Sequence, residues 1–194
     1  MNAIQPMVNI INRVSLINSI STCIKLFNAL VSSTVLYAVS VCGAGLADDL
    51  ETVHNSWFRR LLSLQINTPG YFKRKELGIE KMKVKIFKSI LNFVQRILEM
   101  PEESLPRIAF ERLQYLNKHN TLDKRHNSLN CLETTFFERI GRVNDWRNLT
   151  VDLLRKNKEC YISRFRKKLK EEDRVMCETS TSLVIYQEIT QSEK

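Results

Sequence analysis

The sequence contains few of the residues that make tight turns. Only five glycines and four prolines occur among 194 residues. Folds built from short β-strands need many such residues, because a turn joins each strand to the next. The shortage argues against an all-β fold and predicts long helices with short connections. We therefore expect an all-α protein, a multi-helix bundle with a less ordered C-terminal tail.

Motifs that would support independent catalysis are also missing. The chain has no glycine-rich phosphate loop, no His-Glu-x-x-His helix and no Gly-x-Ser-x-Gly turn. Residues 46–49 are similar to the aromatic-Ala-Asp-Asp box that holds metal ions in polymerases. That box needs a β-hairpin, whereas Gly43 and Gly45 precede this one and a helical pattern follows. We expect no enzyme activity and interpret Asp48 and Asp49 as a helix start, where negative charge meets the helix dipole.

Cysteine and histidine are too few and too scattered to predict a metal site. The five cysteines are odd in number and widely spaced, and no cleavable signal peptide precedes them, which favours reduced thiols in the nucleus or cytoplasm. The spacing of His119, His126 and Cys131 partly matches a zinc knuckle, but a structural zinc needs four ligands and no second pair lies upstream. We expect an intracellular protein without a cofactor.

Residues 26–47 carry no charge. A run of about 20 uncharged residues has the length of a membrane span. However, Asn28 and several hydroxyl residues interrupt it, and Leu, Ile and Phe are sparse. We expect a buried core helix here and no membrane partner, with a membrane anchor over 26–47 as the alternative.

Apolar residues recur every three or four positions along most of the chain, which predicts helices. The first runs from Ile20 to Gly43. The second begins at Asp48, where Asp48 and Glu51 are placed like a capping box. Its apolar stripe is Leu50, Val53, Trp57, Leu61 and Leu64.

Prolines and a polar segment divide the remaining helices. A short helix starts after Pro69, because proline is tolerated in a first helical turn. The other predicted helices are 79–100, which Pro101 ends, a shorter one from Pro106 to Leu116, 129–140 and 145–174. The polar segment 117–127 is the predicted boundary between a region 1–116 and a region 128–194. In the tail from Thr179, only Leu183 to Ile189 has an apolar pattern.

Positive charge is in excess. Lys and Arg total 30 against 21 Asp and Glu, with a net charge of +9 and a pI near 9.4, which favours a partner that carries phosphate. A cluster led by the aromatic residues Tyr71 and Phe72 could neutralise phosphates while an aromatic ring stacks on a base. The alternative is a solvated helix face with both aromatic rings in the core. The cluster consists of Lys73, Arg74, Lys75, Lys81, Lys83, Lys85 and Lys88.

A second group of cations lies near the C-terminus. It contains Arg164, Arg166, Lys167, Lys168 and Lys170, and Glu171, Glu172 and Asp173 follow directly and partly cancel its field. Arg59 and Arg60 lie beside the apolar stripe of the second helix. We predict that Arg59, Arg60, the cluster from Tyr71 to Lys88, and the C-terminal group bind RNA or DNA.

The chain resembles the region after the palm in non-LTR, LINE-type retrotransposon reverse transcriptases. The similarity begins at residues 26–31 (LFNALV), 35–38 (VLYA) and 41–43 (VCG), where the family has a helix that ends in a tyrosine and a Trp-Gly pair. Cys42 stands at the tryptophan position, and Ser40 stands near a common acidic residue. The similarity continues through 50–54 (LETVH), 57–64 (WFRRLLSL), 68–71 (TPGY) and 74–78 (RKELG).

The elements 68–71 and 74–78 are similar to insect members in particular. The resemblance covers roughly residues 20 to 190, is strong as far as Gly78 and is loose beyond it. It implies that 1–116 is a thumb-like region and that the chain lacks fingers, palm and catalytic residues. The expected function is sequence-independent binding of nucleic acid along the template-primer backbone. The alternative is a decayed relic with no selected function. Without the palm, the apolar stripe from Leu50 to Leu64 is expected to stay exposed and to favour self-association.

Overall fold

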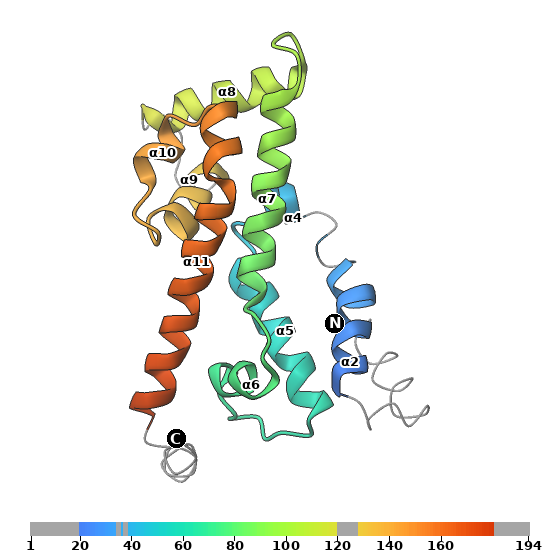
Figure 1. Cartoon of the computed structure of the whole chain (residues 1–194). Coiled ribbons are helices and arrows are strands. Elements are labelled where there is room, and N and C mark those ends of the chain that lie inside the picture. The colour runs from blue at the N-terminus through green and yellow to red at the C-terminus, as the bar shows by residue number, and fades with distance from the viewer. Residues whose placement is uncertain (1–19, 34–35, 37–38, 120–127, 181–194) are drawn as a thin grey trace.

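The computed structural model describes residues 20–33, 36, 39–119 and 128–180 (Figure 1). Within these ranges every regular element is a helix, so the predicted all-α fold is confirmed. The elements are α2 (Ile20–Leu26), the π-helix η2 (Phe27–Ser32), α4 (Val39–Cys42), α5 (Ala47–Leu61), α6 (Gly70–Leu77), α7 (Met82–Glu99), α8 (Leu105–Lys118), α9 (Ser128–Leu132), the π-helix η3 (Glu133–Phe137), α10 (Val143–Arg147) and α11 (Val151–Thr179).

Two long helices, α7 and α11, lie side by side and form the axis of the molecule (Figure 1). Helix α8 crosses one end of this pair, and α9, η3 and α10 pack beneath it. Helices α5 and α6 lie at the other end, where α5 contacts α7 and α6 contacts α11. The C-terminal half of α11 therefore faces α6, and this contact positions the candidate site.

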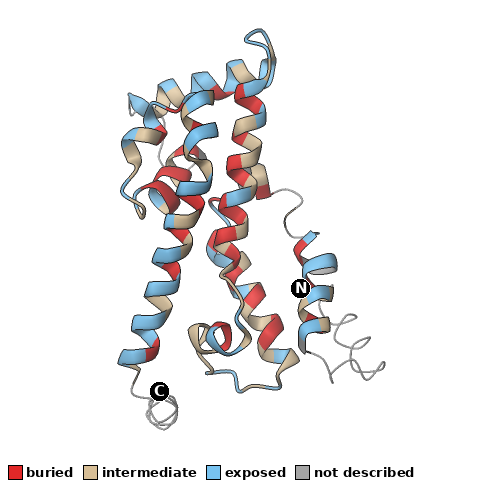
Figure 2. Ribbon diagram, in the orientation of Figure 1, coloured by how far each residue is buried: buried red, intermediate tan, exposed pale blue. Residues whose placement is uncertain are grey.

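The core is centred on Phe87 of α7. Its ring stacks on Phe136 of η3 at 4.8 Å and meets Phe165 of α11 at 5.1 Å between ring centroids. Such aromatic pairs add to the free energy gained from burying their area. Buried side chains from before and after the segment 117–127 belong to the same hydrophobic core. Figure 2 shows that α7 carries buried residues along most of its length, whereas α8 and α11 expose their outer faces.

Proline sets several helix ends where the sequence predicted them, and glycine sets one more. Met100 has an extended backbone before Pro101, as steric contact with a following proline favours. Pro106 lies in the first turn of α8, and Pro69 precedes α6. Gly78 ends α6 in the left-handed conformation, with a φ of 62°.

The predicted continuous helix from Ile20 to Gly43 is wrong. The structure has α2, then the π-helix η2, and then the separate short helix α4. Hydroxyl side chains that bond back to the preceding turn disturb a regular helix, and Ser33 Oγ donates to the Ala29 carbonyl oxygen at 2.6 Å. Among the described residues, no helix is long and apolar enough to cross a membrane.

The predicted cap of α5 is also wrong. The helix begins at Ala47 after Leu46, without a side-chain cap, and Asp48 and Asp49 lie in its first turn. The interpretation of this pair as a helix start is confirmed, while Glu51 turns inward rather than capping.

The buried face of α5 differs from the predicted apolar stripe. Its buried residues are Ala47, Glu51, His54, Trp57 and Phe58. Of the predicted stripe only Trp57 is fully buried, and Leu50, Val53, Leu61 and Leu64 are half-buried. The buried face of α5 is rotated relative to the predicted stripe, because Glu51 points toward α6 and α7 and joins a buried polar network there.

The two C-terminal helices are interrupted where the sequence predicted continuity. The helix expected over 129–140 ends as the π-helix η3, and the one expected over 145–174 divides into α10 and α11. Thr150 separates these two, because its hydroxyl accepts a hydrogen bond from the Leu153 backbone N–H at 3.3 Å and caps α11. The predicted tail element Leu183 to Ile189 lies outside the described residues.

Candidate nucleic-acid interface

The structure divides the predicted basic residues into two sets. In the first set, the cation is buried or paired within the described part of the chain. In the second set, the cation is exposed on a helix surface. The first set consists of Lys73, Arg74, Lys81, Lys83, Lys85 and Arg166.

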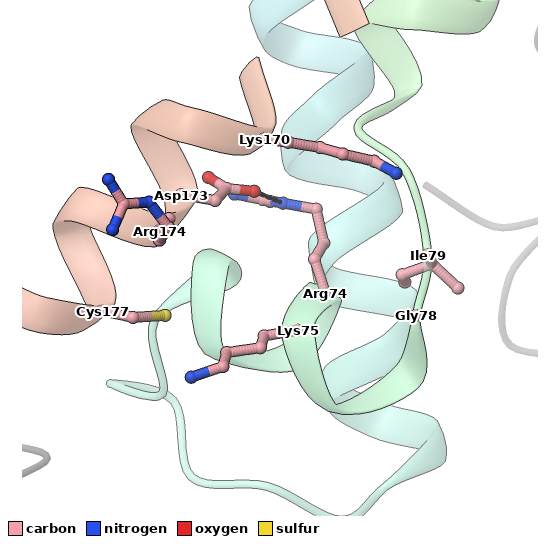
Figure 3. A pocket seen from close by; sticks show the side chains of 8 residues that line it. All are labelled: Arg74, Lys75, Gly78, Ile79, Lys170, Asp173, Arg174 and Cys177. Carbon is pink, nitrogen blue, oxygen red and sulfur yellow. Dashed lines mark hydrogen bonds and ion pairs between the residues drawn. The ribbon is translucent and has the colours of Figure 1, made fainter. Parts of the chain in front are cut away.

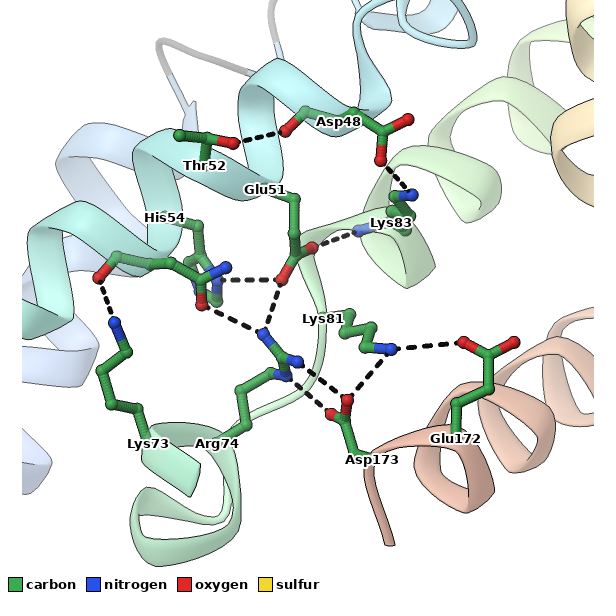
Figure 4. A network of polar contacts seen from close by, with 11 residues as sticks. Asp48, Glu51, Thr52, His54, Lys73, Arg74, Lys81, Lys83, Glu172 and Asp173 are labelled. Atoms are coloured by element: carbon green, nitrogen blue, oxygen red, sulfur yellow. Dashed lines mark hydrogen bonds and ion pairs between the residues drawn. The ribbon is translucent and has the colours of Figure 1, made fainter. Parts of the chain in front are cut away.

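Arg74 is the centre of the first set and is only 8% exposed. Its Nε and Nη2 donate to the two carboxylate oxygens of Asp173 at 2.7 and 2.8 Å (Figure 4). Its Nη1 donates to Glu51 Oε1 at 3.2 Å and to Asn55 Oδ1 at 3.0 Å. A bidentate pair of this kind is the strongest geometry a guanidinium offers. The sequence predicted that Arg74 contacts phosphate. In the structure its guanidinium instead binds carboxylates of α5 and α11.

The carboxylates of this network are held in their ionised form. Burial opposes ionisation of Asp173, but hydrogen bonds and positive charge from Arg74 and Lys81 outweigh it and keep the pKa of Asp173 below its ordinary value. Burial likewise opposes ionisation of Glu51, yet His54, Arg74 and the Lys83 backbone N–H lower its pKa overall. The network is thus a set of charged pairs that joins α5, α6, α7 and α11.

Lys73 is 4% exposed, and its Nζ donates to the Asn55 carbonyl oxygen at 3.2 Å. Burial, followed by the nearby charges of Arg59 and Arg74, lowers the pKa of Lys73. Lys81 donates to Asp173 Oδ1 at 3.0 Å. The sequence predicted that the ammonium groups of Lys73 and Lys81 face solvent, but both bind partners within the fold instead.

Three further members of the first set have partners nearer the surface. Lys83 pairs with Asp48, Lys85 bonds to Asn28, and Arg166 pairs with Glu80 at 2.6 Å. The acidic run 171–173 was expected to cancel the field of its own helix. Two of its members instead neutralise cations of α6 and α7, and Glu172 also pairs with Arg139 at 3.4 Å.

The second set lies mostly on α11. Arg164, Lys167 and Lys168 are exposed there, as the sequence predicted, and Lys156 and Lys170 are exposed with them. Leu154, Phe165 and Leu169 of the same helix are buried, and we call the five exposed cations together the outer α11 stripe. Within the described residues none of the five has a carboxylate partner.

The other predicted residues lie apart from this stripe. Lys88 is exposed on α7, Arg60 on α5 and Lys75 on α6, while Arg59 and Tyr71 are half-buried. The structure therefore does not gather all predicted residues on one surface. Lys156 could have been found from sequence by its helical spacing to Arg164 and Lys167, whereas no local signal marks Arg139.

A pocket of about 280 Å³ lies between α6 and α11, beside the Arg74–Asp173 pair (Figure 3). Lys75 and Lys170 line it, but their ammonium groups point to opposite sides. This pocket therefore does not focus positive charge on one point.

No metal site is formed by the described residues, because no three His, Cys, Asp or Glu side chains come together there. His119, one of the three residues with zinc-like spacing, lies against the ring of Tyr115 at 4.4 Å between centroids. His126 lies outside the described residues.

Comparison with protein-family models, with curated proteins and with solved structures found no match.

Proposed function

We propose that this chain binds RNA or DNA through the outer α11 stripe, by contacts to phosphates and without reading the bases. The observation that supports the proposal is the exposure of five cations along one helix, without a carboxylate partner among the described residues. From Lys156 to Lys170 the stripe spans roughly 20 Å at the rise of an α-helix. That length covers several successive phosphates of a nucleic acid.

Charge supports the same partner. The net charge is +9, and many cations outside the stripe are matched by carboxylates within the fold. The unmatched excess on α11 creates a positive field that attracts polyanions. The similarity to the thumb region of LINE-type reverse transcriptases agrees with this role, in which the chain grips a duplex without catalysing synthesis.

The test is fluorescence anisotropy of a labelled RNA–DNA duplex with the purified chain across a salt series. We expect the logarithm of the affinity to fall linearly with the logarithm of salt concentration, because bound phosphates release counterions. The double variant Arg164→Glu, Lys167→Glu should bind more weakly and reduce the slope by about 1.5, since each lost phosphate contact removes roughly 0.7–0.9.

The matched control is Arg112→Glu, Lys118→Glu, which makes the same charge change at exposed positions of α8. It should keep most of the affinity of the unmodified chain. Equal losses of duplex affinity in both double variants would contradict a specific role of the stripe, because general charge attraction would then explain the binding. An absence of binding at low salt would instead favour the alternative, a relic whose charge serves no partner.

A further inference from the structure

A second, polar pocket of about 320 Å³ is also lined by Arg74 and lies between α5, α6, the start of α7 and α11. Four cationic side chains and two carboxylates line it, and Asp173 and Asp48 pair with two of these cations from outside the lining. We call it the Arg139 pocket. The residues that matter for its chemistry are Tyr71, Arg74, Lys81, Arg139 and Glu172.

The donors of this pocket differ in how far they are already used. Asp173, Glu51 and Asn55 already accept hydrogen bonds from Arg74, so the charge of Arg74 is compensated within the fold. Arg139 is 40% exposed, and its one ion pair among the described residues is with Glu172. The hydroxyl of Tyr71 has no hydrogen-bond partner within the described part of the chain. Arg139, Lys81 and Tyr71 therefore retain capacity to bind an anion.

Glu172 occupies the position that an external anion would take. It contacts Lys81 and Arg139, but both distances are 3.4 Å, and its side chain is 38% exposed. Charge-assisted hydrogen bonds are normally about 2.7–2.9 Å long. The neighbouring Asp173, with contacts of 2.7, 2.8 and 3.0 Å, is held much more closely.

We propose that the Arg139 pocket is a phosphate-binding site in which a phosphate group displaces Glu172 from Lys81 and Arg139. A guanidinium binds phosphate and carboxylate oxygens with the same geometry, so the exchange needs no rearrangement of Arg139. Asp173 stays on Arg74 and preserves the fold. The Tyr71 hydroxyl donates a further hydrogen bond to the phosphate.

The phosphate is a backbone phosphate of the nucleic acid bound on the outer α11 stripe, and in this assignment the inference depends on the proposed function. Lys168 of that stripe lines a neighbouring pocket together with Tyr71, Lys81 and Glu172. Lys168 therefore lies near the Arg139 pocket. A free phosphate ion has the same recognition chemistry, and the experiment separates the two sources.

The experiment measures two affinities for each variant: inorganic phosphate by calorimetric titration, and a labelled RNA–DNA duplex by anisotropy. Glu172→Gln removes the competing charge and should raise phosphate affinity roughly two- to fivefold, the effect expected for a partly exposed ion pair. Arg139→Gln should lower it by a similar factor. Glu171→Gln is the control, because it makes the same charge change on the adjacent residue, which pairs with Arg174 outside the pocket.

The outcomes distinguish the pocket from the proposed function. Matching changes in phosphate and duplex affinity in Glu172→Gln, without change in Glu171→Gln, support the assignment to a backbone phosphate. Phosphate binding that responds to Glu172, without any duplex binding, supports the pocket with free phosphate as its ligand and overturns the proposed function. Duplex binding that depends on Arg164 and Lys167 but not on Glu172 or Arg139 overturns the pocket proposal and leaves the proposed function standing. An equal effect of Glu171→Gln and Glu172→Gln has the same meaning. Unchanged tryptophan fluorescence in each variant verifies the fold.

Discussion

At the scale of single residues, Arg74 combines two properties that rarely occur together, burial and a full charge. Water cannot solvate its guanidinium, so Asp173, Glu51 and Asn55 do so instead. A buried charge without its partners is much less stable than either the complete pair or an apolar replacement of the whole set. The network is therefore sensitive to the loss of any one member.

We expect Arg74→Met to destabilise the protein by about 3 kcal/mol, at the lower end of the range for breaking a buried pair because Asp173 keeps some access to water. The two carboxylates would then lie in a half-buried site without their main cation. Urea unfolding followed by the fluorescence of the buried Trp57 and Trp146 measures the change. The control Lys88→Met removes an exposed cation from α7 and should cost less than about 0.5 kcal/mol. Equal losses in the two variants would contradict a structural role for Arg74.

At the scale of elements, the short helix α6 positions both Lys73 and Arg74. It ends at Gly78, whose φ of 62° is unfavourable for side chains with a Cβ. No atom lies within 4 Å of a Cβ built at Gly78, so a substitution there changes backbone strain without a clash. The length of α6, and with it the direction of Arg74, depends on this one conformation.

We expect Gly78→Ala to destabilise the fold by about 1 kcal/mol through strain in the left-handed conformation. Gly78→Asn should lose less, because asparagine tolerates this conformation better than alanine. Thermal unfolding of the two variants gives the comparison. If alanine and asparagine were equally harmful, backbone strain would not be the cause.

Helix boundaries could be predicted from sequence where local chemistry decides them. Pro101 and Pro106 act on their own backbone or on that of the residue before them, so the end of α7 and the start of α8 followed from the sequence. The break between α2 and α4 and the lack of a side-chain cap at the start of α5 did not follow from the sequence. In both places the apolar spacing continues, whereas side-chain hydrogen bonds and contacts with other helices determine the backbone conformation.

At the scale of the whole molecule, ionised carboxylates hold α11 against α6 and α7. The folded-state pKa values of Glu51 and Asp173 lie below their ordinary values of 4.5 and 3.8. An acid with a lowered pKa stabilises the fold at any pH above its ordinary value. That contribution is lost as the pH falls through the lowered value, because the unfolded chain then binds protons more readily.

We therefore expect the free energy of unfolding to be constant near neutral pH and to fall as the pH drops below about 4.5, the ordinary value for Glu51. Asp173→Asn should be less stable at neutral pH and should lose less stability on acidification than the unmodified chain. Chemical unfolding at a series of pH values provides both quantities. Glu159→Gln, at an exposed position of α11, should leave the pH dependence unchanged. An identical pH dependence in Asp173→Asn would show that the network is not its source.

The helical class, several helix ends and the excess of positive charge can be predicted from the sequence, because these depend on composition and on residues within a turn or two of each other. Which cations remain exposed depends on the tertiary structure. Arg74 and Asp173 are 99 positions apart, and no local pattern reports that they meet. Because Asp173 of α11 pairs with Arg74 within the fold, the basic cluster from Lys73 to Lys85 is largely a structural network. Exposed positive charge remains along α11, in the outer α11 stripe, as well as at the Arg139 pocket and at single positions of other helices.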